Sequence, residues 1–204
     1  MVAPIWLRDK FLKLIQREAE HAKEGKASRI IAKMNSLCDA KIIAALYEAS
    51  CAGVQVDLIV RGICCLVAGK PGVSENIRVR SIVGTFLEHA RIFYFYNDGH
   101  EEIYMGSADW MPRNLDRRVE IVFPVEEEEL KEKAKHILDV QLSDTLKAHR
   151  LLEDGTYQKV DRRGKEAIEA QKTFCEEAIA AANESKKKVP KKRTFDPRFS
   201  PQEE

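Results

Sequence analysis

The sequence predicts an α/β protein in which a mixed β-sheet is flanked by helices, with one helix before the sheet and a helical extension after it. Three patterns support this prediction: a strand, helix and strand in the first third of the chain, an aromatic hairpin near its middle, and long charged helical segments towards its end. With 204 residues, of which 44% are hydrophobic and 33% charged, the chain can bury one core of ordinary size. We therefore expect one main domain.

The first elements follow from the spacing of apolar residues. Residues 5–24 carry apolar groups at helical spacing, which indicates an amphipathic helix that ends near Gly25. Residues 29–34 and 54–60 are rich in apolar side chains and are predicted as strands, joined by a helix that stops near Gly53. Because the connection is short and the strands are apolar on both faces, they should pair in parallel inside a sheet covered by helices.

The middle of the chain predicts a β-hairpin and two further strands. Residues 91–96 form an aromatic segment that passes through an Asn-Asp-Gly turn at 97–99 into residues 102–105. Residues 77–83 are rich in apolar side chains and precede the hairpin, and residues 119–125 supply one more strand after it.

The last third of the chain is predicted to be helical. A helix of about 25 residues should begin at the acidic run 126–129, where negative charge suits a helix N-terminus. After Gly155 and Tyr157 a last helix should run to about Asn183, and the remaining tail should be disordered. The expected division is an N-terminal helix at 1–26, an α/β domain at 27–126, C-terminal helices packing on it at 127–184, and a basic tail at 185–204.

Charge and cysteine content argue against several classes of protein. Lysine and arginine number 34 against 33 acidic residues, so the total charge gives no general attraction to nucleic acid or membrane. The five cysteines are odd in number and lack CxxC spacing, which is typical of reduced thiols in a cytosolic protein. No pair of histidines has zinc spacing. No apolar run reaches about 18 residues, and the charged N-terminus does not fit a signal peptide.

Polar residues gather where the predicted strands end. In open α/β sheets ligands bind beyond the carboxyl ends of the strands, so residues 33–37 and 61–66 should lie along one functional edge. The cluster Glu88-His89-Ala90-Arg91 comes directly before the first hairpin strand, and Gly106-Ser107-Ala108-Asp109-Trp110 follows the second. The hairpin should bring these two clusters together.

The residue types in these clusters suit phosphate chemistry. His89 and Arg91 lie two residues apart, so an extended backbone projects both side chains to one side and sets a proton carrier or nucleophile beside a fixed charge. Phosphoryl transfer is catalysed largely by positioned cations, and the planar arginine fork suits that task. Further arginines flank the predicted site: Arg61, Arg78, Arg80, Arg113, Arg117 and Arg118. They predict an anionic ligand, although Arg78, Arg80 and Arg117 could equally pair with surface acids.

One short pattern resembles half of a phospholipase-D-type active site. The pattern is His-x-basic, then a strand, then Gly-Ser-x-(Asn/Asp), and it is carried here by His89, Arg91, Gly106, Ser107 and Asp109. That superfamily usually has lysine at the position of Arg91, aspartate at the position of Tyr96 and asparagine at the position of Asp109. These differences argue against ordinary phosphodiester hydrolysis.

Longer stretches resemble bacterial polyphosphate kinase over roughly residues 5–160. The matching segments are Ile30-Ile31-Ala32-Lys33-Met34-Asn35, Asp57-Leu58-Ile59-Val60-Arg61-Gly62-Ile63-Cys64-Cys65, Ser74-Glu75-Asn76-Ile77-Arg78, Leu87-Glu88-His89-Ala90-Arg91, and Ser107-Ala108-Asp109-Trp110-Met111-Pro112-Arg113-Asn114-Leu115-Asp116-Arg117-Arg118. The chain resembles the C-terminal, phospholipase-D-like catalytic domain of that family.

This resemblance implies reversible transfer of the terminal phosphate of ATP to inorganic polyphosphate through a phosphohistidine in a domain outside this chain. It implies ATP or ADP and polyphosphate as ligands, Mg²⁺ bound mainly outside this chain, and no metal ligand here. The implied partners are the remaining domains of a polyphosphate kinase, a homo-oligomer in the full-length enzyme, and no specific nucleic acid. The implied location is the cytoplasm, with the inner face of the membrane as an alternative, and the isolated chain should be inactive.

The resemblance assigns Arg61 and His89 to contacts with the nucleotide phosphates, with His89 as an acid, base or charge partner. We place Arg91 beside His89 as a second catalytic residue and Arg113 as a further phosphate contact. The structural alternative for His89 is a histidine held by Glu88 or by a backbone carbonyl.

The other candidates have supporting roles or two interpretations. Lys33 and Asn35 either contact phosphate from a strand end or form hydrogen bonds behind the site. Ser107 either donates to a phosphate oxygen or caps a turn, while Asp109 and Glu120 are predicted to orient Arg or His side chains. Four neighbouring residues are expected to pack in the interior: Cys64, Cys65, Trp110 and Met111.

Two other functions fit parts of the sequence. A free-standing phosphodiesterase or nuclease could pair two equivalent half-sites by dimerising, but the substituted motif positions count against it. A non-catalytic polyanion-binding module could rely on the basic segment 186–193. Its binding to a polyanion would then depend steeply on salt, and truncation of that segment would remove the dependence. A requirement for Arg61, His89 and Arg91 would instead favour the structured site.

Overall fold

The computed structural model describes residues 1–188 of the chain. The first compact unit, Met1–Gln171, contains every strand, and the second begins at Lys172. In its described part the second unit consists of the continuation of helix α4 (Ala170–Lys188). Among the described residues, no helix is both long and apolar enough to cross a membrane.

The first unit is built on a nine-stranded sheet in the order β1-β7-β6-β5-β2-β3-β4-β8-β9. The strands are β1 (Val2–Ala3), β2 (Arg29–Met34), β3 (Gln55–Val60), β4 (Ile77–Ile82), β5 (Ile92–Phe95), β6 (Glu102–Gly106), β7 (Glu120–Val125), β8 (Ala148–Leu151) and β9 (Tyr157–Lys159). The helices of this unit are α1 (Leu7–Lys23), α2 (Ala40–Ala52) and α3 (Glu128–Leu142), with short helical turns η1 (Asn97–Gly99) and η2 (Arg113–Arg117).

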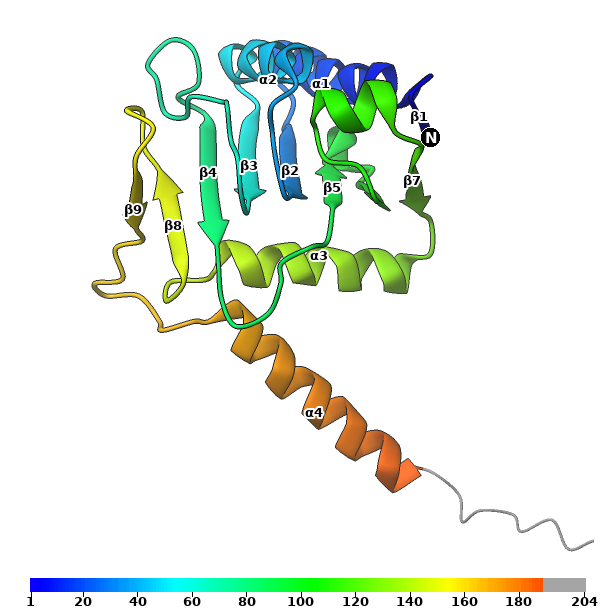
Figure 1. Cartoon of the computed structure of the whole chain (residues 1–204), viewed down its shortest axis with the longest axis vertical. Coiled ribbons are helices and arrows are strands. Elements are labelled where there is room, and N and C mark those ends of the chain that lie inside the picture. The colour runs from blue at the N-terminus through cyan, green and yellow to red at the C-terminus, as the bar shows by residue number, and fades with distance from the viewer. Residues whose placement is uncertain (189–204) are drawn as a thin grey trace, which may run out of the picture. The chain divides into compact units, whose positions relative to one another are not determined.

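The sheet is mixed, as predicted. Strands β2, β3 and β4 are parallel neighbours, whereas β6 is antiparallel to both β5 and β7, and β5 is antiparallel to β2. Helices α1 and α2 lie along one side of the strands in Figure 1, and α3 runs separately from them. The predicted parallel pair and the predicted hairpin are both confirmed.

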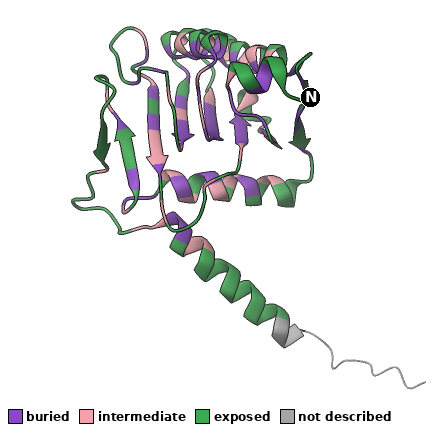
Figure 2. Cartoon of the chain, in the orientation of Figure 1, coloured by how far each residue is buried: buried purple, intermediate pink, exposed green. Residues whose placement is uncertain are grey.

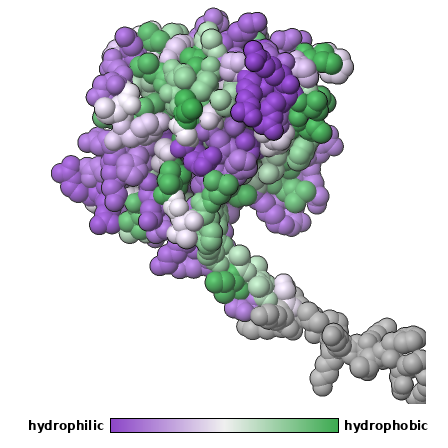
Figure 3. All heavy atoms as spheres, in the orientation of Figure 1, coloured by the Kyte–Doolittle hydropathy of each residue, from purple (hydrophilic) through white to green (hydrophobic). Residues whose placement is uncertain are grey.

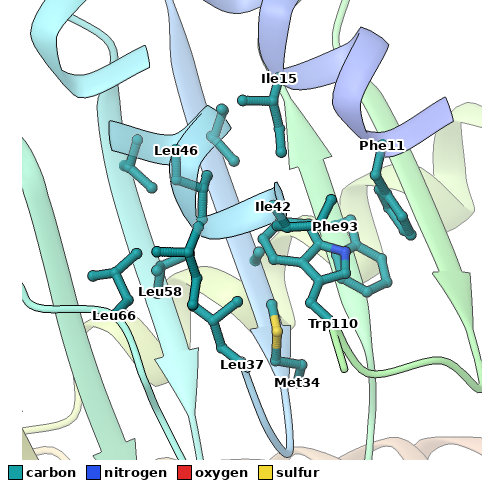
Figure 4. Packing of buried hydrophobic residues seen from close by; sticks show 14 of the residues in the cluster. Phe11, Ile15, Met34, Leu37, Ile42, Leu46, Leu58, Leu66, Phe93 and Trp110 are labelled. Carbon is teal, nitrogen blue, oxygen red and sulfur yellow. The ribbon is translucent and has the colours of Figure 1, made fainter. Parts of the chain in front are cut away.

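The larger hydrophobic core lies between the sheet and helices α1 and α2. At its centre Phe93 stacks on Trp110 with ring centroids 5.2 Å apart, and Phe11 meets Trp110 edge-on at 5.3 Å (Figure 4). Purple segments of the central strands in Figure 2 mark this burial. A smaller core on the other face packs Ile31 and Ile92 with Leu138 of α3. Because both faces are covered, the central strands are apolar on both sides.

Local capping fixes the helix that joins the parallel strands. The Asp39 carboxylate accepts a hydrogen bond from the Ile42 amide at 3.1 Å, which caps the N-terminus of α2. Gly53 ends the helix in the left-handed conformation, with φ of 104°. The same Asp39 accepts from Arg8 of α1 at 2.8 Å and thereby links the two helices.

The last third of the first unit differs from the prediction. The helix expected to span about 25 residues ends at Leu142 as α3, and a hairpin of β8 and β9 follows it. The Asp144 carboxylate accepts backbone N–H groups of Leu146, Lys147 and Ala148, at 3.1, 2.7 and 3.0 Å, and this local bonding competes with further helix.

The final helix extends beyond its predicted end. Helix α4 continues past the expected end near Asn183 to Lys188. Most of the predicted basic tail, residues 189–204, lies outside the described residues. The proposed division into segments 1–26, 27–126, 127–184 and 185–204 stays a prediction.

Candidate active site

The carboxyl ends of β2 and β3 form one edge, as the sequence predicted. Met34 and Val60 are register partners, and beyond them the Gly62 amide donates to the Asn35 carbonyl at 2.8 Å. The Leu37 amide donates to the Ile63 carbonyl at 2.9 Å, which continues the contact past the strands. A Cβ at Gly62 would lie 3.0 Å from the Asn35 carbonyl oxygen, so this close approach favours glycine.

The hairpin brings its two polar clusters together through an ion pair. Arg91, before β5, donates from Nε and Nη2 to the two carboxylate oxygens of Asp109, after β6, each at 3.1 Å. Asp109 also accepts the Asn35 backbone N–H at 2.7 Å. One buried carboxylate therefore joins the ends of β2, β5 and β6, so the predicted orienting contact of Asp109 with an arginine is present.

Arg61 is held at one nitrogen and free at two. Its Nε donates to the Asn35 side-chain oxygen at 2.9 Å, and its carbonyl accepts from the Ser81 hydroxyl at 2.9 Å. Among residues 1–188, Nη1 and Nη2 of Arg61 have no hydrogen-bond acceptor. Arg61 also lines a cavity of about 330 Å³ with the loop that follows β4. A positioned guanidinium with a free fork can bind two oxygens of a phosphate.

His89 is exposed at the same edge, and Glu88 does not hold its ring. The His89 carbonyl accepts from Arg91 Nη1 at 2.8 Å, which fixes the backbone, while the imidazole has no hydrogen bond to any described residue. Glu88 instead pairs with Lys33, with Nζ and Oε2 3.1 Å apart. The arrangement differs from the structural alternative in which Glu88 or a carbonyl fixes the imidazole.

Lys33 lies behind the site. Its side chain is 2% exposed, and its ammonium contacts Glu88 and donates to the Ala90 carbonyl at 3.4 Å. Burial lowers the pKa of Lys33, and the neighbouring Glu88 carboxylate opposes that shift. Of the two interpretations, this geometry favours support of the 88–90 loop over direct contact with phosphate.

Two buried glutamines complete this support, and neither was predicted. The side chains of Gln141, in the last turn of α3, and Gln171, at the start of α4, donate to the Glu88 carboxylate at 2.7 and 2.9 Å. Each residue looks like an ordinary helix-surface residue in the sequence. The only feature of the sequence that could have indicated a buried role for these glutamines is that each lies beside apolar residues that are buried.

A second polar cluster surrounds Glu120, at the start of β7. The Ser107 hydroxyl donates to the Glu120 carboxylate, the Asn114 amide donates to it at 2.6 Å, and Arg118 approaches it at 3.4 Å. Glu120 therefore contacts an arginine, although neither His89 nor Arg91 is its partner. Ser107 also accepts the backbone N–H of Ile121 at 3.3 Å.

The motif glycine Gly106 is required by close packing. A Cβ there would lie 2.7 Å from Val122 Cγ2 and 2.8 Å from its Cα, so β6 and β7 could not keep their spacing with a larger residue.

The remaining predicted residues fall in different environments. Trp110 is buried as predicted and Met111 is half-buried, while Arg113 is exposed in η2 and forms no hydrogen bond with the Arg61 or Asp109 clusters. Cys64 packs against the core, but Cys65 is exposed, so its predicted packing was wrong: the strand has already ended there. All five cysteines are free thiols: Cys38, Cys51, Cys64, Cys65 and Cys175.

The described residues provide no evident site for Mg²⁺. In residues 1–188, no group of three or more His, Cys, Asp or Glu side chains could hold a metal ion. Two carboxylates at the candidate site, Asp109 and Glu120, already accept several hydrogen bonds. Each of their four oxygens is therefore occupied by a donor of the protein itself.

Comparisons with known proteins identify the relatives of this chain. The family model described as Polyphosphate kinase C-terminal domain 2 matches residues 1–171. Polyphosphate kinase from Synechocystis sp. is 54% identical over 90% of this chain and 25% of its own length. The enzyme of that name from Pseudomonas aeruginosa is 54% identical over 79% of this chain and 24% of its own length.

Solved structures give the same result. Polyphosphate kinase from Porphyromonas gingivalis superposes with a TM-score of 0.86 at 40% identity, over 90% of this chain and 28% of that chain. NucT from Helicobacter pylori has a TM-score of 0.50 at 16% identity, over 70% of this chain and 92% of that chain, which indicates a shared fold alone. The chain spans about a quarter of the length of the curated relatives it matches. It belongs to the polyphosphate kinase family and corresponds to the family's C-terminal domain 2.

Proposed function

We propose that this chain supplies one half of a phosphoryl-transfer site that binds ATP or ADP and inorganic polyphosphate, and that other domains of a polyphosphate kinase complete it. Transfer would run reversibly between ATP and polyphosphate, through a phosphohistidine outside this chain. The observation that supports this most strongly is the pairing of a free Arg61 fork with an unbonded, exposed His89 at one sheet edge.

The two residues would have different tasks. Arg61 is held at Nε by Asn35, so its free Nη groups would bind phosphate oxygens and stabilise charge in the transition state. The His89 imidazole is free to act as an acid, a base or a charge partner for the same group. Mg²⁺, where the complete enzyme binds it, would neutralise phosphate charge from outside the described residues.

Arg91 fits a positioning role better than a catalytic one. All three of its side-chain nitrogens donate to protein oxygens, two towards Asp109 and one towards the His89 carbonyl. Arg91 would thus fix the backbone that carries His89, while Arg61 and His89 contact the substrate. Roles for Ser107 and Arg113 at phosphate stay predictions.

The test is ATP formation from ADP and polyphosphate with Mg²⁺. We compare the chain alone, the chain mixed with the remaining domains of a polyphosphate kinase, and the same mixture with Arg61→Gln. Activity should appear only in the mixture and fall about a hundredfold or more with Arg61→Gln, since one charge-stabilising contact is lost. ATP formation by the chain alone would show that a nucleophile lies within it and would overturn the half-site proposal.

A further inference from the structure

A second group of cations lies on strands β4 and β8. Arg80 and Arg150 are register partners, and the next pair along, Ile82 and Ala148, belongs to the core beneath α3. Side chains two residues apart on a strand project to the same face. Arg78, Arg80 and Arg150 therefore share the sheet face that α3 covers in part.

These arginines line a groove of about 640 Å³. We call it the basic groove and define it by six of its lining residues: Arg78, Arg80, Arg150, Lys159, Arg163 and Lys165. Its lining contains one acidic residue, Asp161, which already pairs with Arg163 at 2.7 Å. Figure 3 shows mostly hydrophilic residues on the side of the molecule where Figure 1 places β8 and β9.

The groove concentrates positive charge that the protein does not neutralise. Arg80 and Arg150 are directly opposite one another, an arrangement that destabilises a sheet when the charges are alike. In the part of the chain that the structure describes, Arg78, Arg150, Lys159 and Lys165 have no carboxylate at ion-pair distance. An external anion would remove this repulsion.

Nearby carboxylates are already occupied. Asp57 lies opposite Arg78 in the register of β3 and β4, but its carboxylate pairs with Arg29 at 2.9 Å. The Asp144 carboxylate accepts four backbone N–H groups, three directly after α3 and one from Ala170 at 2.8 Å. Both acids attract the Arg80 charge, but neither forms an ion pair with a residue of the groove.

Arg80 is fixed at the base of this group. Its Nη1 donates to the carbonyls of Gln141, at 3.2 Å, and Leu142 at the C-terminus of α3, where carbonyl dipoles attract a cation. Burial lowers the pKa of Arg80. The groove thus combines one guanidinium in a fixed position, that of Arg80, with several exposed cations. This combination suits a flexible ligand that carries negative charge along its whole length.

The lining also indicates what kind of polyanion fits. It includes no aromatic residue, so a nucleobase would find no ring to stack on, and single-stranded nucleic acids gain much of their affinity from stacking. Cations on β4, β8, β9 and the loop after β9 would each meet a different phosphate of a long chain. A single orthophosphate could contact only a few of them.

We propose that the basic groove is a second binding site for a linear inorganic polyphosphate chain, separate from the Arg61 and His89 edge. The choice of polyphosphate among polyanions rests on the proposed function. Ser81, next to Arg80, bonds to the Arg61 carbonyl, so the groove adjoins the strand that carries the catalytic edge. A chain held there would stay at high local concentration near the site of transfer.

The test is equilibrium binding of long-chain inorganic polyphosphate to the complete chain at several salt concentrations. The main variant is Arg150→Gln with Lys165→Gln, since both residues line the groove and have exposed side chains. The matched control is Lys147→Gln with Arg162→Gln, which removes two exposed cations of neighbouring segments outside the groove. Circular dichroism checks folding, and Arg78→Gln gives a second measurement that does not depend on the double variant.

The groove variant should weaken polyphosphate binding about tenfold or more, and the slope of log K against log salt should become shallower by about 0.7 for each lost contact. The control should change binding less than about twofold. Equal loss in both variants, or no loss with either Arg78→Gln or the double variant, would overturn the proposal. Equally tight binding of a single-stranded oligonucleotide of similar charge would also overturn it.

The binding test and the transfer assay can fail separately. His89→Ala should abolish transfer in the reconstituted mixture and leave groove binding unchanged. If the mixture forms no ATP but the groove still discriminates polyphosphate, only the proposed function fails. If ATP forms and the groove variant binds polyphosphate normally, only the second site fails.

Discussion

The Arg61 and His89 edge and the basic groove place their arginines in opposite environments. At the edge, Arg91 donates to the buried Asp109 carboxylate and to the His89 carbonyl, whereas Arg61 has one bonded nitrogen and two without an acceptor among residues 1–188. In the groove, Arg78 and Arg150 face an open space without a carboxylate partner among the described residues. Directional hydrogen bonds can set the orientation of one phosphate, whereas clustered charge gives affinity without a fixed geometry. Substitutions should therefore have large, specific effects at the edge and small, salt-sensitive effects in the groove.

The largest expected effect is that of Asp109→Asn. The side chains of Asp109 and Arg91 are 9% and 12% exposed, so loss of the carboxylate leaves a guanidinium charge without its partner. We expect a loss of about 3–5 kcal/mol in the free energy of unfolding, measured by urea denaturation. Asp161→Asn removes an ion pair with side chains 60% and 91% exposed and should change that free energy by less than about 0.5 kcal/mol. Equal effects of the two substitutions would contradict the contrast between edge and groove.

Next in size is Gly106→Ala, which tests the packing beneath the motif. The new methyl group would press on Val122, and we expect a loss of about 1–3 kcal/mol in the free energy of unfolding. Thermal unfolding followed by circular dichroism measures it. Wild-type stability in this variant would mean that β6 and β7 separate easily and that Gly106 has no packing role.

An intermediate effect concerns pH and Lys33. Because burial lowers the pKa of Lys33 below its ordinary value of 10.5, the folded state binds this proton less tightly than the unfolded state does. The free energy of unfolding should therefore rise with pH between the lowered pKa and 10.5, with a slope of at most about 1.4 kcal/mol per pH unit. Lys33→Met should remove this contribution, whereas Lys147→Met, at an exposed lysine, should keep it. The same slope in both variants would exclude Lys33 as its source.

The smallest effect on stability is expected in the groove. Arg150→Gln removes the like charge opposite Arg80 and should raise the free energy of unfolding by about 0.2–1 kcal/mol at low salt. Added salt should erase the gain, because it screens exposed charges. Urea denaturation at two salt concentrations measures it, and a loss of stability at low salt would show that Arg150 makes a favourable contact.

The sequence was most informative where structure depends on local pattern. The predicted strand over residues 29–34 coincides with β2, and the helix that follows ends at the predicted Gly53. Both could be predicted because the spacing of apolar residues and the helix caps depend on residues that are close together in the sequence. The shared edge of β2 and β3 followed from parallel pairing. The end of α3 was missed because the Asp144 carboxylate competes locally with further helix, a choice that residue spacing does not reveal.

Long-range partners were beyond sequence reasoning. Glu88 meets Gln141 and Gln171, which are 53 and 83 positions away, and nothing in the sequence marks either glutamine as its partner. Arg80 lies opposite Arg150 only because β8, a strand of the unpredicted hairpin, pairs with β4. The clusters 88–91 and 106–110 could be found because they flank one short hairpin, whereas the groove is assembled from segments that only the fold brings together.

The most direct test of the central claim is a comparison of His89→Asn with His100→Asn in the reconstituted polyphosphate kinase mixture. Both histidines are exposed, but only His89 adjoins the Arg61 and Asp109 cluster. The rate of ATP formation from ADP and polyphosphate should fall about a hundredfold or more with His89→Asn and stay near wild type with His100→Asn. A wild-type rate with His89→Asn would contradict the assignment of this sheet edge as half of the phosphoryl-transfer site.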